Sequence, residues 1–277
     1  MFPDRSQFSG LRRAIPVLVR SGVAPCPPRG GCNGVAASSS STESQEMNPA
    51  RIEPMQDELA IAHAGRMALF LGSSSSQGFN LWLKRESGRS CGVSSNVPRL
   101  TQLAAIAGMS SIDYARQHSM MGALRVAARP ADMASYGAHE GVNFTKRLGM
   151  LTQKADAHLC PRCVEEDLDH PKFSWFRRTH QLQGIDWCPT HRTPLIKVRG
   201  SDPWALLPQH WMERGEVEVL KLGASDLDPN GFVNRFMEIA CALLERPRPF
   251  AVRLLVGRSG AGAWIAHQSR GCQTQPE

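Results

Sequence analysis

Apolar residues in the central part of the chain recur at helical spacing, in short runs separated by breaks. The run from 58 to 71 predicts a first helix, because its apolar residues fall loosely on one face: Leu59, Ala62, Met67 and Leu69. Gly72 and the serines of 73–76 interrupt the pattern and predict a loop. Apolar positions resume at Phe79 and continue to Leu83, so helical structure is expected to continue there.

Two further helices are predicted around a tight turn between residues 98 and 118. Pro98 precedes a periodic apolar run that ends at Gly108, with Leu100, Leu103, Ile106 and Ala107 as its apolar members. The next segment begins at Ser111 and is expected to place three side chains on one apolar face, Ile112, Tyr114 and Ala115. The hydroxyl of Ser110 is predicted to cap this second helix. Asp113, three residues later, is predicted to interact with Ser110 in return, as in a weak capping box.

Two helices joined by a glycine turn resemble a helix-turn-helix, in which the second helix contacts DNA. Between Lys84 and Arg129 the chain has seven Lys and Arg residues against two acidic ones, a net charge of +5. This excess favours an anionic partner. The DNA contacts expected from this region are Arg99, Arg116, Gln117, His118 and Arg125. A purely structural helical hairpin is the alternative, because such hairpins are common in helical domains.

The remaining patterns divide the chain into four parts. Residues 1–54 are rich in Arg, Ser, Pro and Gly and are predicted to be a disordered extension, with a transit peptide or translated upstream sequence as alternatives. Residues 55–150 are predicted to be a helical domain with the helix-turn-helix. Residues 151–200 form a cysteine-containing core with a strand near Ile196. Residues 201–277 are predicted to be a short helical region with an amphipathic helix at 231–246 and a frayed tail from Ser269.

Composition and charge narrow the class of protein. The 277 residues include 32 Lys and Arg against 25 Asp and Glu, a formal net charge of +7, and nucleic acid is the leading candidate partner. No apolar stretch approaches the roughly 18 residues of a membrane-spanning helix, so no membrane partner is expected. The N-terminus lacks the features of a secretory signal. A cytoplasmic protein at the nucleoid is therefore expected.

The strongest motif pairs two metal-binding knuckles. Cys160-Pro-Arg-Cys163 is followed, 24 residues later, by Cys188-Pro-Thr-His191. Two residues between ligands let one tight turn present both side chains to a single ion. Sulfur-rich tetrahedral coordination favours zinc, and four protein ligands close its shell, so one structural zinc is predicted rather than a catalytic one. The fold class is therefore mainly α with a small zinc-ribbon or zinc-knuckle (α+β) module.

Between the knuckles lie an acidic run, 165–169, and a basic aromatic stretch, 173–181. The acidic residues are expected to form a solvated helix face, with the carboxylates of a metal-dependent nuclease as the alternative. Arg177 and Arg178 are predicted to contact phosphate. The aromatic residues beside them, Phe173, Trp175 and Phe176, are expected to form a small core over the zinc.

The knuckles and the sequence between them resemble the zinc-binding core of the TniQ family. The resemblance covers about 40 residues and includes Phe176-Arg-Arg-Thr-His-Gln and the frame from Gly184 to Leu195 as well as the ligands. It implies that Cys160, Cys163, Cys188 and His191 coordinate zinc. It also implies that the helical segment before them is the family's N-terminal domain with a helix-turn-helix. TniQ proteins are target-selection components of transposons that also carry a DDE transposase and an AAA+ ATPase.

The resemblance implies a non-enzymatic adaptor that binds DNA and recruits the AAA+ ATPase and DDE transposase to a target site. An RNA-guided complex and a second copy of the chain are further candidate partners. A stand-alone zinc-containing DNA-binding regulator or interaction module is the alternative, since it would share the hairpin and the zinc.

Overall fold

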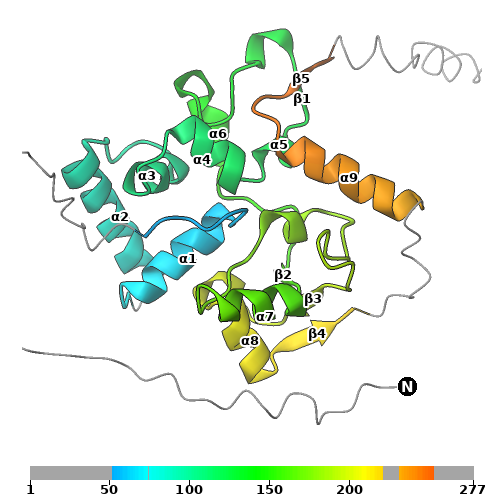
Figure 1. The fold of residues 1–277 in the computed structure, drawn as a ribbon. Helices are drawn as coiled ribbons and strands as arrows, with labels where there is room; N and C mark the ends of the chain where they lie inside the picture. The colour runs from blue at the N-terminus through cyan, green and yellow to red at the C-terminus, as the bar shows by residue number, and fades with distance from the viewer. Residues whose placement is uncertain (1–51, 74, 221–230, 253–277) are drawn as a thin grey trace, which may run out of the picture. The chain divides into compact units, whose positions relative to one another are not determined.

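The computed structural model describes residues 52–73, 75–220 and 231–252, all of which belong to a compact unit formed by Met47–Glu277. About half of this part is helical, and the strands are only two or three residues long (Figure 1). The α-helices are α1 Ala60–Phe70, α2 Ser76–Cys91, α3 Arg99–Ile106, α4 Ser111–His118, α5 Met121–Leu124, α6 Val142–Leu148, α7 Pro161–Asp169, α8 Pro208–Arg214 and α9 Phe232–Leu244. The strands are β1 Ala127–Ala128, β2 His158–Leu159, β3 Ile196–Val198, β4 Val217–Val219 and β5 Phe250–Ala251. Single 3-10 turns are η2 Pro130–Asp132, η3 His139–Gly141, η4 Arg178–Gln181 and η5 Pro203–Ala205.

Helix α1 confirms the first predicted helix and packs between two apolar cores. One side contributes Ala60, Ala64 and Met67 to a core formed with α2, α3, α4 and α6. Leu59, before α1, and Ala62 belong to the second core, which contains the three-stranded sheet, α8 and α9. A Cβ atom at Gly65 would lie within van der Waals overlap of the Trp204 carbonyl oxygen, so only glycine allows η5 to approach α1 this closely.

The break after α1 also follows the predicted pattern. Gly72 adopts a left-handed conformation with φ of 64°, which glycine tolerates best. Helix α2 then begins at Ser76, where the Ser75 hydroxyl accepts a hydrogen bond from the Gly78 amide at 3.0 Å. Of the apolar residues that predicted continued helix, Phe79 and Leu83 are buried in the first core. The loop and the second helix are therefore both confirmed.

Helices α3 and α4 form the predicted hairpin. Gly108 turns the chain with φ of 69°, and the Ser110 hydroxyl accepts a hydrogen bond from the Asp113 amide at 3.0 Å while donating to its carboxylate. Tyr114 and Ala115 are buried as expected, whereas Ile112 is 41% exposed. Its predicted place on the buried face is wrong, because the eight-residue α4 turns that position outward.

The second core holds a small antiparallel sheet of order β2-β3-β4. Leu159 on β2 pairs with Ile196 on β3, and Ile196 pairs with Val219 on β4. The predicted strand near Ile196 is confirmed. Separately, β1 pairs with β5 in parallel, which ties the segment after α9 to the segment after α5. The sheet is too short to be stable by pairing alone, so its order depends on what is packed around it.

Helix α9 confirms the amphipathic helix predicted for 231–246. The side chains of Met237 and Leu244 are buried in the second core, whereas Phe232 is 84% exposed and Ile239 48% exposed. The backbone at the end of α9 lies against α5, where a Cβ at Gly122 would be 2.7 Å from the Leu243 carbonyl oxygen. Packing against α5 and the second core buries the face of α9 that carries Met237 and Leu244. The face that carries Phe232 and Ile239 is exposed.

Two predictions concern residues that lie largely outside the described part of the chain. The extension predicted to be disordered, 1–54, is described only from residue 52 onward, and the predicted frayed tail from Ser269 lies outside the described residues. Residues 52–54 contact α1: the Ile52 carbonyl lies 2.9 Å from His63 Nε2, and the Glu53 carbonyl accepts from Arg66 at 2.7 Å. Among the described residues, no helix has the length and apolar character needed to cross a membrane.

A buried polar network joins α1 to α4. Glu58 and Arg66 form an ion pair of 2.7 Å with both side chains almost fully buried. The Glu58 carbonyl oxygen lies 2.9 Å from Nδ1 of His118, and Nδ1 of His63 lies 2.7 Å from the Tyr114 hydroxyl. Buried polar groups are tolerated when each has a partner. The network therefore fixes the orientation of α4 relative to α1.

We expect the His118→Gln variant to have a flatter pH dependence of stability than the wild type. Burial, together with the nearby Arg178 charge, lowers the pKa of His118 from 6.5 to about 4, although its hydrogen bond to Glu58 opposes the shift. Between these values the unfolded chain binds a proton that the folded chain does not. Stability is therefore full above pH 6.5 and is lost as the pH falls towards 4, by up to about 3 kcal/mol.

Denaturant unfolding of both proteins from about pH 8 down to about pH 4.5 measures this difference, and metal loss on acidification affects both alike. The exposed His139 provides the control, since His139→Gln should keep the wild-type pH profile. Equal profiles for wild type and His118→Gln would contradict the assignment.

Candidate metal centre

Two turns from distant parts of the chain supply the four candidate ligands. Cys160 directly follows β2 and is the N-cap residue of α7, and Cys163 lies in the first turn of that helix. Pro161 occupies the first helical position, where its fixed φ favours helix initiation and no amide hydrogen bond is lost. This local geometry places both thiols at the same end of α7.

Cys188 and His191 lie in a tight loop closed by the bridge between Trp187 and Pro194. The Cys188 amide donates to the Thr193 carbonyl at 2.8 Å, and the Arg192 amide donates back to the Cys188 carbonyl at 2.9 Å. Arg192 has φ of 54°, so the chain reverses in a left-handed conformation immediately after the last ligand. The loop directs both of its ligand side chains towards the start of α7.

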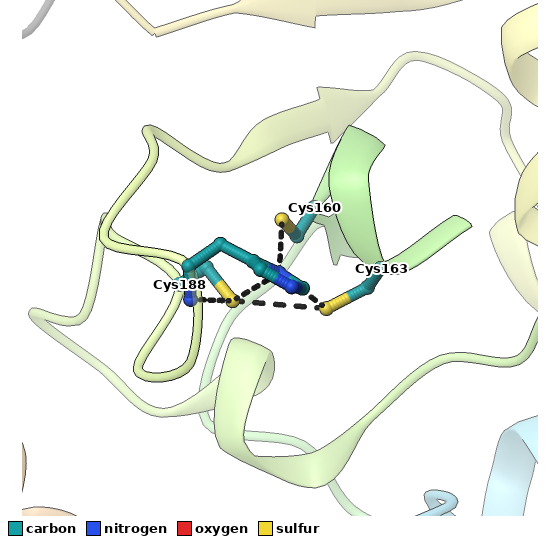
Figure 2. A group of neighbouring side chains, drawn as sticks. Cys160, Cys163 and Cys188 are labelled. Atoms are coloured by element: carbon teal, nitrogen blue, oxygen red, sulfur yellow. Dashed lines mark hydrogen bonds between the residues drawn. The ribbon is translucent and has the colours of Figure 1, made fainter. Parts of the chain in front are cut away.

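The four ligand atoms all lie within 4.8 Å of one another (Figure 2). The Cys163 and Cys188 sulfurs are 3.7 Å apart, and His191 Nδ1 lies 3.5 Å, 3.3 Å and 3.7 Å from the sulfurs of Cys160, Cys163 and Cys188. With Zn–S bonds of about 2.3 Å, two sulfurs of a tetrahedral site lie about 3.8 Å apart. The group therefore has the donor set and the size of one zinc site.

Neighbouring groups orient the ligands. The Glu166 carboxylate lies 2.8 Å from His191 Nε2, which leaves Nδ1 directed at the thiols. A carboxylate in this position fixes the ring of a metal-bound histidine and raises its basicity. The Thr193 hydroxyl lies 3.3 Å from the Cys160 sulfur, and the His191 amide donates to the Cys188 sulfur at 3.4 Å. Hydrogen bonds to sulfur stabilise negative charge on the thiolates.

The thiols share their protons unequally in the absence of an ion. Hydrogen bonds with Cys163 and Cys188 lower the pKa of Cys160, whereas the same hydrogen bond with Cys160 raises the pKa of Cys163. Three thiols this close do not all ionise without a compensating cation. A divalent ion would supply that charge, and its binding would release protons.

His180 is a further member of the site that the ligand spacing did not indicate. It is buried, its Nε2 lies 4.0 Å from the Cys163 sulfur, and burial lowers its pKa to about 3. The contact of Glu166 with His191 was not predicted. The position of Glu166 three residues after Cys163 places both on one side of α7, a signal that the sequence does contain.

The aromatic residues expected over the metal lie elsewhere. Phe176 packs edge-on against Trp204 with ring centroids 5.1 Å apart, and Phe173 packs edge-on against Phe70 of α1. The apolar residue buried together with the three cysteines is Leu195. The segment 173–176 thus packs against α1 and η5, and the Phe176 carbonyl accepts a hydrogen bond from the Leu59 amide at 2.9 Å.

The acidic run on α7 is only partly a solvated face. Glu165 and Asp169 are exposed, but Asp167 is buried and forms a bidentate ion pair with Arg177 at 2.7 Å and 2.9 Å. The Glu166 carboxylate is hydrogen-bonded to the His191 ring. Within the described ranges, these carboxylates do not form a group that can hold a catalytic ion. Nothing in this arrangement favours the nuclease alternative.

The structure separates the predicted DNA contacts into buried and accessible residues. His118 is 3% exposed, and Arg178 is 2% exposed with its guanidinium hydrogen-bonded inside the protein. Arg177 is engaged with Asp167. These three side chains stabilise the fold, so the structure gives a reason to remove them from the candidate DNA surface.

The other four predicted contacts are reachable from solvent to different degrees. The Arg116 side chain is 43% exposed, with Asp113 3.6 Å away, and Gln117 beside it is half-buried. Arg99 and Arg125 are partly buried over aromatic rings, those of Phe79 at 5.7 Å and Phe144 at 4.0 Å. Further exposed basic residues were not predicted as contacts: Lys84, Arg85 and Arg89 on α2 and Lys146 and Arg147 on α6.

Comparison with known protein families covers the hairpin and the metal centre together. The TniQ family model matches residues 49–195, which is more than half of the chain and includes all four candidate ligands. The chain belongs to the TniQ family. This membership makes it a protein associated with transposition and confirms the resemblance seen in the knuckles. No curated protein is significantly similar to this TniQ chain.

We expect Cys188→Ser to abolish metal binding and unfold the region around β2, β3 and α7. Removing one ligand leaves buried thiols without their cation and forfeits binding energy on the order of 10 kcal/mol, comparable to the whole stability of a domain. Metal analysis and thermal unfolding test this, with the exposed Cys91→Ser as the matched control. Wild-type metal content and stability in Cys188→Ser would refute the assignment of this ligand.

Proposed function

We propose that this TniQ-family protein is a non-enzymatic DNA-targeting adaptor whose fold is stabilised by one zinc ion. The observation that carries the proposal is the family match across 49–195, which covers both the hairpin and the metal centre. The adaptor would bind target DNA and recruit an AAA+ ATPase, which in turn would bring a DDE transposase to the site.

The geometry of the metal centre supports a structural role for zinc. Three buried thiols and one imidazole would complete the tetrahedral shell of a zinc ion, whereas a catalytic zinc keeps one position open for water. Zinc at this site would therefore hold the two turns together and supply no reaction chemistry. Its binding energy would stabilise a module whose strands are too short to be stable by themselves.

Accessible basic residues on the helical part support binding to DNA. Arg116 on α4, Lys84, Arg85 and Arg89 on α2, and Lys146 and Arg147 on α6 are exposed. Phosphate contacts by such residues supply affinity without sequence specificity, and each contact releases a counterion. The proposal therefore places the DNA on the helical part and leaves the metal module as its support.

Binding of duplex DNA and of the ATPase tests the proposal directly. The purified protein should bind duplex DNA at low salt, and it should retain an AAA+ ATPase encoded beside it in a pull-down. An RNA-guided complex is the partner to add if the protein alone selects no site. DNA binding without any ATPase partner would favour a stand-alone regulator instead, and absence of both activities would reject the adaptor.

We expect Arg116→Ala to weaken DNA binding several-fold and to reduce its salt dependence. Loss of one phosphate contact should lower the slope of log affinity against log salt concentration by about 0.9. Fluorescence anisotropy across a salt series measures both quantities. Arg199→Ala is a matched control, because Arg199 also has one carboxylate 3.6 Å away but lies beside the three-stranded sheet. An unchanged salt slope for Arg116→Ala would mean that the hairpin has only a structural role.

A further inference from the structure

Arg178 contacts the C-terminal end of α4 from a distant part of the chain. Its Nη1 donates to the Arg116 carbonyl at 2.6 Å and to the Ser119 carbonyl at 3.3 Å. Helix α4 ends at His118, so these oxygens lie at the end of the helix where carbonyls lack intrahelical partners. A positive charge there is also favourable for the helix dipole.

Two carboxylates hold the guanidinium in this position. Its Nε donates to Asp57 at 2.9 Å, and its Nη2 donates to Glu245 at 2.7 Å. Thr179 fixes Asp57 in turn, with its hydroxyl 2.7 Å and its amide 3.2 Å from the other carboxylate oxygen. Because the planar guanidinium has donors in fixed directions, these partners also set where its contacts to α4 point.

The segment that carries Arg178 is anchored to the metal centre at both ends. It lies between Cys163 and Cys188, and its neighbour Arg177 forms the ion pair with Asp167 on α7. The side chain of Gln181 bonds both the amide and the carbonyl of His158, two residues before Cys160. The position of Arg178 therefore depends on the same turns that carry the ligands.

Helix α4 is short enough for this contact to decide its stability. It has eight residues, and isolated helices shorter than about 12 residues are marginal in water. Its N-terminus has a local cap in Ser110, and at its C-terminal end the amide and hydroxyl of Ser119 both donate to the Ala115 carbonyl. The next carbonyl, that of Arg116, accepts from Arg178. Arg178 places its positive charge against the last carbonyl groups of α4.

We propose that Arg178 is a positioning residue: a long-range C-cap that makes the order of α4 dependent on metal binding. Metal binding fixes the segment between Cys163 and Cys188, that segment presents Arg178, and Arg178 holds the last turn of the helix that bears Arg116. Arg178 touches no DNA. Only the DNA readout of this proposal rests on the proposed function.

Hydrogen exchange of the full-length protein tests the cap. In metal-loaded Arg178→Gln, we expect amides of 111–118 to exchange roughly tenfold faster or more than in the wild type, since a hydrogen-bonded charge is lost. Amides of α3 and the metal content should stay unchanged. Arg199→Gln is the control, because it removes the same charge from an exposed position beside the three-stranded sheet and keeps every contact to α4.

The remaining outcomes also decide the proposal. Unchanged exchange in 111–118 with metal retained would overturn it. If Arg178→Gln fails to fold, Arg178→Lys decides instead: its ammonium reaches fewer acceptors, so faster exchange confined to 111–118 supports the cap and wild-type exchange rejects it.

A DNA-binding measurement then distinguishes a positioning role of Arg178 from a direct contact between Arg178 and DNA. Metal-loaded Arg178→Gln should bind DNA more weakly with an unchanged salt slope, because no phosphate contact is removed. A slope reduced by about one contact would mean that Arg178 itself reaches phosphate and would overturn the proposal. If the wild type binds no DNA, the proposed function fails while the exchange result still stands.

Discussion

The convergence of three thiols and one imidazole on a single point is the constraint on which the arrangement of residues 157–198 depends. The strands in this region contain two or three residues, and the segment between the two ligand pairs is mostly a 3-10 turn and loops. Strand pairing alone cannot order such a region. Its apolar side chains pack in the second core, away from the ligands, and only Leu195 is buried together with the three cysteines. A metal ion would add binding energy on the order of 10 kcal/mol at the point where both turns meet.

Buried ionic contacts extend this constraint into the helical part of the protein. Glu58 pairs with Arg66 inside the fold, and Arg178 joins Asp57, α4 and Glu245. Removing one member of such a pair leaves an uncompensated charge, at a cost of about 3–5 kcal/mol. These contacts stabilise one particular docking of the metal module on α1 and α4. In the proposed adaptor, the metal would thereby support the helices that face DNA without contacting DNA itself.

The sequence predicted local structure and the candidate ligands better than it predicted contacts between distant segments. Glycine breaks, the Ser110 cap and knuckle spacing act within a few residues, so they can be read directly along the chain. The buried positions of His118 and Arg178 depend on partners about 60 or more residues away, and a basic motif does not reveal them. The buried face of α9 could not be predicted for a related reason: both sides of that helix contain apolar residues, and packing against distant segments selects one of them.

Metal analysis combined with X-ray absorption of the purified full-length protein tests the central claim most directly. The account predicts one zinc ion per chain, with three sulfur ligands at about 2.3 Å and one nitrogen ligand at about 2.0 Å. A folded protein without stoichiometric metal, or a bound ion coordinated mainly by oxygen, would contradict it.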